Sequence, residues 1–147
     1  MMLPVLFLVL AADQSGALLP DGPGKETVSR ICTDCHDTAN IRKLRLPRDQ
    51  WSDKMDEMVD RGAKGTDQEM AAVLDYLTQN FGPDSKIYVN SAPFSELKAI
   101  LKLTNEETDA VLAYRKQNGN FQQWRDLLKV AALDGKKIEA KKDLLAF

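Results

Sequence analysis

The feature that most constrains this chain is the run Cys32-Thr33-Asp34-Cys35-His36, which holds both cysteines and the only histidine of its 147 residues. Two thiols one helical turn apart, followed at once by an imidazole, form the attachment signature of a c-type haem. A zinc site normally needs four protein ligands, and no further Cys or His exists to complete one. A disulfide or a redox pair is the plainer alternative, although no βαβ pattern accompanies the motif. The motif therefore predicts one covalently attached haem c.

The N-terminus carries the one long apolar run of the chain, residues 2–12. It contains a proline and is too short to span a bilayer comfortably, so it is typical of the central region of a secretory signal. Small residues follow, and cleavage after Ala12 or after Ala17 is plausible. Residues 1–17 are thus predicted to be a signal peptide, and the product to be periplasmic or otherwise exported, with no membrane span after cleavage.

Charge divides the remaining chain into two parts. Residues 18–85 carry 9 Lys and Arg against 13 Asp and Glu, a net charge of −4, whereas residues 86–147 carry 11 against 8, a net charge of +3. This shift favours two modules with different surfaces, residues 18–85 and 86–147. Helical spacing and capping residues predict three helices in the first module, beginning near Lys25, at Pro47 and after Thr66. The fold class is predicted to be all-α.

The first module resembles the class I-like c-type cytochrome domains of bacteria over about residues 24–82. The features that match are the motif itself, a helix with Trp51 and methionines, and a closing helix with Tyr76. The resemblance implies thioether bonds at Cys32 and Cys35, with His36 as the proximal iron ligand. It also favours Met58 as the sixth ligand, since it lies late on the tryptophan helix; Met55 and Met70 remain alternatives.

The second module resembles a tandem helix-hairpin-helix domain, as in competence-type DNA receptors, over about residues 87–145. The matching stretches are residues 89–92, 96–97, 113–115, 119–121 and 126–130. DNA-binding members present glycine-rich hairpins whose backbone N–H groups meet phosphate. Here the first hairpin, residues 101–104, has no glycine, and the second, residues 132–135, contains Asp134. Nucleic acid is therefore predicted to be an unlikely partner, and protein docking the more plausible use.

The function predicted from these patterns is that of an exported monohaem electron carrier whose helix-hairpin-helix module docks a redox protein partner. The alternative is a haem-tethered DNA- or protein-binding module in which the haem is structural or sensory. No nucleophile and base are paired in the sequence, so an enzyme is not predicted unless the sixth haem position is open. The sequence leaves the oligomeric state undetermined.

Overall fold

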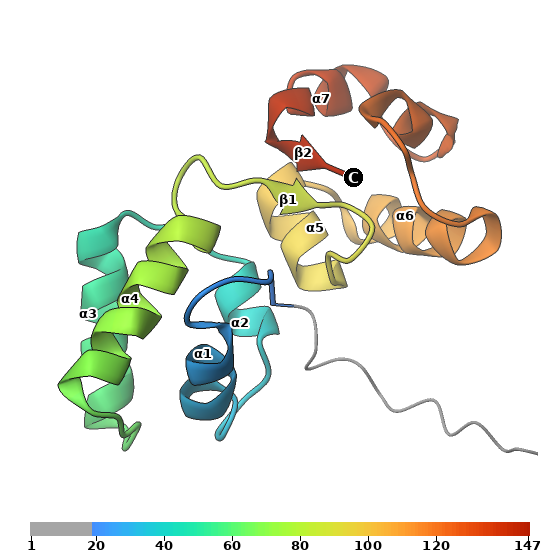
Figure 1. Ribbon diagram of the computed structural model, residues 1–147. Helices are drawn as coiled ribbons and strands as arrows, with labels where there is room; N and C mark the ends of the chain where they lie inside the picture. Colours follow the sequence, from blue (N-terminus) through green and yellow to red (C-terminus); the bar gives the residue numbers. More distant parts are fainter. Residues whose placement is uncertain (1–18) are drawn as a thin grey trace, which may run out of the picture.

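A computed structural model describes residues 19–147, which fold into helices and one two-stranded sheet, so the all-α prediction is confirmed. The predicted signal peptide, residues 1–17, lies outside the described residues. Within residues 19–147, no helix combines the length and apolar character that crossing a membrane requires. Figure 1 shows two groups of helices joined by a connecting loop.

The N-terminal group contains four helices: α1 (Lys25–Cys32), α2 (Ala39–Arg42), α3 (Arg48–Asp60) and α4 (Asp67–Phe81). Pro47 is the N-cap of α3, and Thr66 caps α4 through a reciprocal capping box with Glu69. In Figure 1, α3 and α4 lie side by side, with α1 and α2 next to them. The sequence therefore predicts these helices well, apart from the single turn of α2, which falls in a stretch expected to be partly loop.

The core of this group is small and is built on α4. Val73, Tyr76, Leu77 and Phe81 are buried on it, and the indole Nε1 of Trp51 donates a hydrogen bond of 3.0 Å to the Phe81 carbonyl. Helical spacing predicts Val59 on the same apolar stripe as Trp51, Met55 and Met58, but Val59 is 46% exposed. It is the second-last residue of α3.

The C-terminal group begins with β1 (Ile87–Tyr88), α5 (Phe94–Leu101) and α6 (Asn105–Asn118). The 3-10 helix η2 (Trp124–Lys129), α7 (Gly135–Glu139), the 3-10 helix η3 (Lys142–Leu144) and β2 (Leu145–Ala146) follow. The two strands pair in parallel, with Ile87 opposite Leu145. With Asp134 as its cap, the sequence predicts one last helix over residues 135–145, but α7 ends at Glu139 and the chain turns back so that β2 pairs with β1 (Figure 1).

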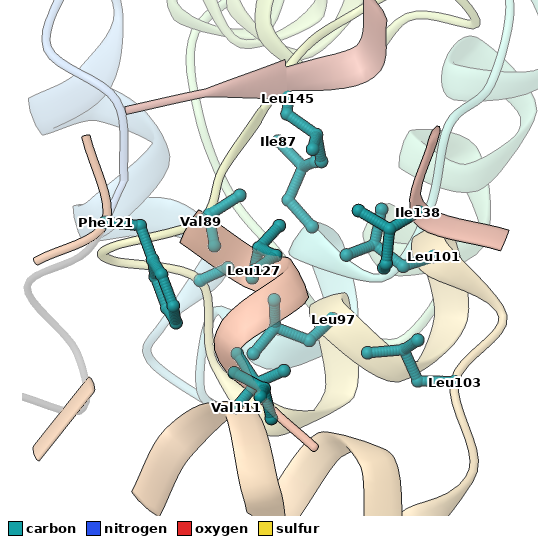
Figure 2. Packing of buried hydrophobic residues seen from close by; sticks show 12 residues of the cluster. Ile87, Val89, Leu97, Leu101, Leu103, Val111, Phe121, Leu127, Ile138 and Leu145 are labelled. Atoms are coloured by element: carbon teal, nitrogen blue, oxygen red, sulfur yellow. The ribbon is translucent and has the colours of Figure 1, made fainter. Parts of the chain in front are cut away.

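A second hydrophobic core fills this group. Figure 2 shows side chains from β1, α5, α6, η2, α7 and β2 packed together. Each of these elements contributes one or two residues to the core, and the connecting segments supply the rest. Ile87, Leu97, Leu101, Leu127 and Ile138 have no exposed surface at all. The first core ends at Phe81 and the second begins at Ile87.

The two groups meet through α2 and α5. The sequence groups Arg42, Lys43, Arg45 and Arg48 in a basic cluster, which would suit haem propionates, an acidic redox partner or a solvated face. Instead Arg42 is 2% exposed, and the side chains of Arg42 and Arg45 both contact the carboxylate of Glu96 in α5. The acidic group that balances this cluster is therefore supplied by the second module.

Candidate functional site

The residues of the Cys32–His36 motif lie at one cavity in the N-terminal group. Its volume is about 330 Å³, and Cys32, Cys35, His36 and Met58 all line it. The remainder of the lining is mainly apolar: Ile31, Asn40, Ile41, Leu44, Trp51, Lys54, Met55, Arg61, Ala63, Met70, Val73 and Leu77. The fold thus brings together all four site residues that the sequence singles out.

The two thiols differ in their surroundings. Cys32 is the last residue of α1 and is half-buried, and this burial raises the pKa of its thiol. Cys35 lies in the turn that follows and is exposed. Both are free thiols in the structure. The motif therefore presents one sulfur at the apolar wall and one at the rim.

His36 has a defined tautomer in its neutral form. Its Nδ1 lies 2.9 Å from the carbonyl oxygen of Asp37, and a carbonyl can only accept, so Nδ1 carries the proton. The lone pair is then on Nε2, which remains available to bind a partner. Met55, Met58 and Met70 all line the same cavity, so the structure does not distinguish Met58 from its two alternatives.

The first hairpin of the C-terminal group connects α5 to α6. Lys102 adopts a left-handed conformation there (φ 58°, ψ 40°), the conformation that glycine usually provides at a helix end. Thr104 caps α6, and its N–H donates to the Glu107 carboxylate over 2.7 Å. A carboxylate of the chain itself therefore occupies the place where an incoming phosphate would meet the helix N-terminus.

The second hairpin connects η2 to α7, and here too a carboxylate of the chain caps the helix N-terminus. Asp134 accepts a hydrogen bond of 2.9 Å from the Lys136 N–H. Nζ of Lys137 lies 2.9 Å from both carboxylate oxygens of Glu107, which links α7 to the start of α6. Hydrogen bonding to Lys137, followed by that to the Thr104 backbone, lowers the pKa of Glu107. The two hairpins thus share one ion pair.

Trp124, Arg125 and Lys142 form a cluster of one aromatic ring and two cations that the sequence did not predict. The guanidinium carbon of Arg125 lies 4.7 Å from the centroid of the Trp124 ring, and Nζ of Lys142 lies 6.0 Å from it. Trp124 and Arg125 are neighbours in η2, whereas Lys142 comes from η3 after the chain has turned back. Because the sequence predicted a continuous helix there, nothing indicated that Lys142 would lie beside Trp124.

Comparisons with known proteins find similarity in two cases. Residues 83–146 match the family model described as helix-hairpin-helix motif. Over 58 residues the chain is 33% identical to ComE operon protein 1 of Bacillus subtilis (strain 168), a region that covers 40% of this chain and 28% of that protein. The chain therefore matches little more than a quarter of this relative's length. No solved structure matches the chain significantly.

These findings correct the predicted function. A helix-hairpin-helix motif and a ComE-operon relative favour the alternative, a binding module, over electron transfer with a redox partner. The same match overturns the expectation that nucleic acid is an unlikely partner.

The prediction of a haem c cofactor is corrected on the same grounds. The family match covers residues 83–146 and does not include the Cys32–His36 motif. Among residues 19–147, no group of three or more His, Cys, Asp or Glu side chains is arranged to hold a metal ion. Cys32, Cys35, His36 and Met58 therefore define a cavity rather than an assigned cofactor site.

Proposed function

We propose that this protein binds nucleic acid through its helix-hairpin-helix module. The observation that carries the proposal is the family match over residues 83–146, a region whose helices pack around one core. The net charge of +3 on residues 86–147 supports it, because cations that neutralise phosphates supply most of non-specific affinity. We propose a binding protein rather than an enzyme.

Fluorescence anisotropy of a labelled oligonucleotide, titrated with the full chain, tests this function. The full chain is needed because Arg42 and Glu96 form a buried pair between the modules. The logarithm of the affinity should fall linearly with the logarithm of the salt concentration, because binding releases counterions from the phosphates. Heparin, a polyanion without bases, serves as the competitor that separates charge from nucleic-acid recognition. Absence of binding at low salt would refute the proposal.

Export from the cytoplasm is part of the proposal and rests on the apolar run of residues 2–12. The mature N-terminus should then begin after Ala12 or Ala17. N-terminal sequencing or the intact mass of protein recovered from the source cells measures this directly. A full-length product that begins at Met1 would contradict cleavage.

A second candidate function belongs to the cavity. We propose that it binds an apolar ligand with an acidic group, because its walls are mainly apolar while Lys54 and Arg61 also line it. The absorption spectrum and intact mass of protein purified from its source would show whether a ligand is retained. An environment-sensitive apolar dye provides a second measurement on protein that carries none.

The cavity also offers a matched pair of variants. Met58→Glu places a charge on its wall and should weaken dye binding at least tenfold, given the cost of burying a carboxylate. Val59→Glu adds the same charge to the next residue of α3, which is 46% exposed and does not line the cavity, and should leave binding unchanged. Equal losses in the two variants would contradict a ligand site at this cavity.

A further inference from the structure

The two hairpins are not free to receive phosphate in this protein. The N-terminus of α6 is capped by Thr104 and Glu107, and that of α7 by Asp134. Lys137, the cation nearest to Glu107, is already paired with it. An approaching phosphate would have to displace these carboxylates or lie against them. If the module binds nucleic acid, its contact surface therefore lies elsewhere.

The cluster of Trp124, Arg125 and Lys142 has the chemistry that the hairpins lack. Arg125 and Lys142 are exposed, and neither forms an ion pair with any acidic residue in the described part of the chain. Both cations lie within 6.0 Å of the centroid of one indole ring. Trp124 packs on the second core from one side and is half-buried, which fixes the ring without covering it completely. Two cations without an ion-pair partner among residues 19–147 thus lie over the ring of one half-buried indole, so the planar guanidinium of Arg125 extends the aromatic surface toward solvent.

We propose that this cluster binds single-stranded nucleic acid. A base stacks on the indole of Trp124 or on the planar guanidinium of Arg125, while Lys142 and Arg125 contact the adjacent phosphates. Single strands are favoured because their unstacked bases can reach an aromatic surface, whereas those of a duplex are stacked on one another. This inference rests on the proposed nucleic-acid binding and names its surface and substrate class.

The test compares two double variants of the full chain. R125A/K142A removes both cations of the cluster, and K98A/K116A removes two exposed cations of α5 and α6 that form no ion pair among residues 19–147. The probe is a labelled single strand of roughly 16 nucleotides, near the upper site size of a small single-strand-binding fold. R125A/K142A should lower affinity about tenfold or more, and K98A/K116A less than threefold.

Salt dependence gives a second readout. Each phosphate contact on a single strand contributes roughly 0.7 to the slope of log affinity against log salt, so R125A/K142A should reduce that slope by about 1.4. Trp124 fluorescence should be quenched by the strand, and Trp124→Phe should abolish the quenching, because the other tryptophan, Trp51, is only 3% exposed and remains shielded.

The outcomes separate this inference from the function on which it rests. Equal losses in the two double variants, or tighter binding of the matching duplex, would overturn the cluster as a single-strand site while leaving nucleic-acid binding intact. Loss confined to R125A/K142A, with quenching that depends on Trp124, supports it. A wild-type chain that binds neither strand form refutes the proposed function itself.

Discussion

Nε of Arg42 donates to Oε2 of Glu96 over 2.6 Å, and each side chain is only 2% exposed. Arg42 belongs to α2 of the N-terminal group and Glu96 to α5 of the C-terminal group. Arg45 completes the arrangement, with its Nη2 2.9 Å from Oε1 of the same carboxylate. The residue before Arg42, Ile41, lines the cavity, so one short helix contacts both the cavity and the second module.

Glu96→Gln should destabilise the protein strongly, because it leaves Arg42 and Arg45 without their counter-charge at a buried position. We expect a loss of about 3–5 kcal/mol in the free energy of unfolding, the range for removing one partner of a buried ion pair. Urea denaturation followed by circular dichroism measures it. Asp75→Asn breaks the exposed pair with Arg48 and should cost no more than about 1 kcal/mol. Similar losses for both variants would contradict the importance of burial.

Gly24→Ala should destabilise the N-terminal group through a close contact between the N-cap of α1 and α4. Gly24 has φ +92°, and a Cβ there would lie 2.9 Å from the Ala72 carbonyl oxygen. Gly62 is the matched control, since it has φ +107° but nothing within 4 Å of a Cβ. Gly62→Ala should therefore cost only the backbone strain, about 1 kcal/mol, and Gly24→Ala distinctly more. Thermal unfolding of the two variants compares them, and a Gly24 loss no larger than the Gly62 loss would show that α4 yields.

Ionised Glu107 should contribute to the free energy of unfolding at neutral pH, and this contribution should be lost in acid. Its pKa is lowered in the folded chain, so its stabilising contribution is complete above the unfolded value of 4.5 and is lost as the pH falls through the lower folded value. Glu107→Gln should therefore reduce the difference in unfolding free energy between neutral and acidic pH. Glu106→Gln, which removes one charge from an exposed neighbour in the first turn of α6 that forms no ion pair among residues 19–147, is the control for the loss of charge alone. Denaturant titrations at both pH values provide the measurement, and an unaltered pH dependence in Glu107→Gln would refute this role.

Local signals in the sequence predicted most of the helices. Thr66 and Thr104 each stand three residues before a glutamate, and both form the expected reciprocal capping boxes. Cys32, Cys35, His36 and Met58 line one cavity, although the comparisons do not support the haem expected there. Local chemistry sets these features, since a cap or a motif depends on residues only a few positions apart.

Features that depend on contacts between residues far apart in the chain could not be predicted from the sequence. β1 and β2 have two residues each, too few to show an alternating pattern, and they pair only because the chain turns back after Glu139. Glu96, the partner of Arg42, is 54 positions away in the sequence. No local pattern therefore indicated that an acidic residue of α5 would bury this arginine. The interpretation of the Cys32–His36 run as a haem site came from the spacing of the motif and from the resemblance of residues 24–82 to cytochrome domains, and neither shows what occupies a cavity.

The two thiols at the cavity should react at different rates. Cys35 is exposed, whereas Cys32 is half-buried with a raised pKa, so less of it is thiolate at a given pH. Brief treatment of the folded protein with iodoacetamide near neutral pH should label Cys35 first, as seen by peptide mass spectrometry. In urea both cysteines should be labelled at similar rates, because unfolding removes the difference in burial. Equal rates in the folded protein would contradict the burial of Cys32, and sulfurs that take up no label even in urea would show that they are already bonded.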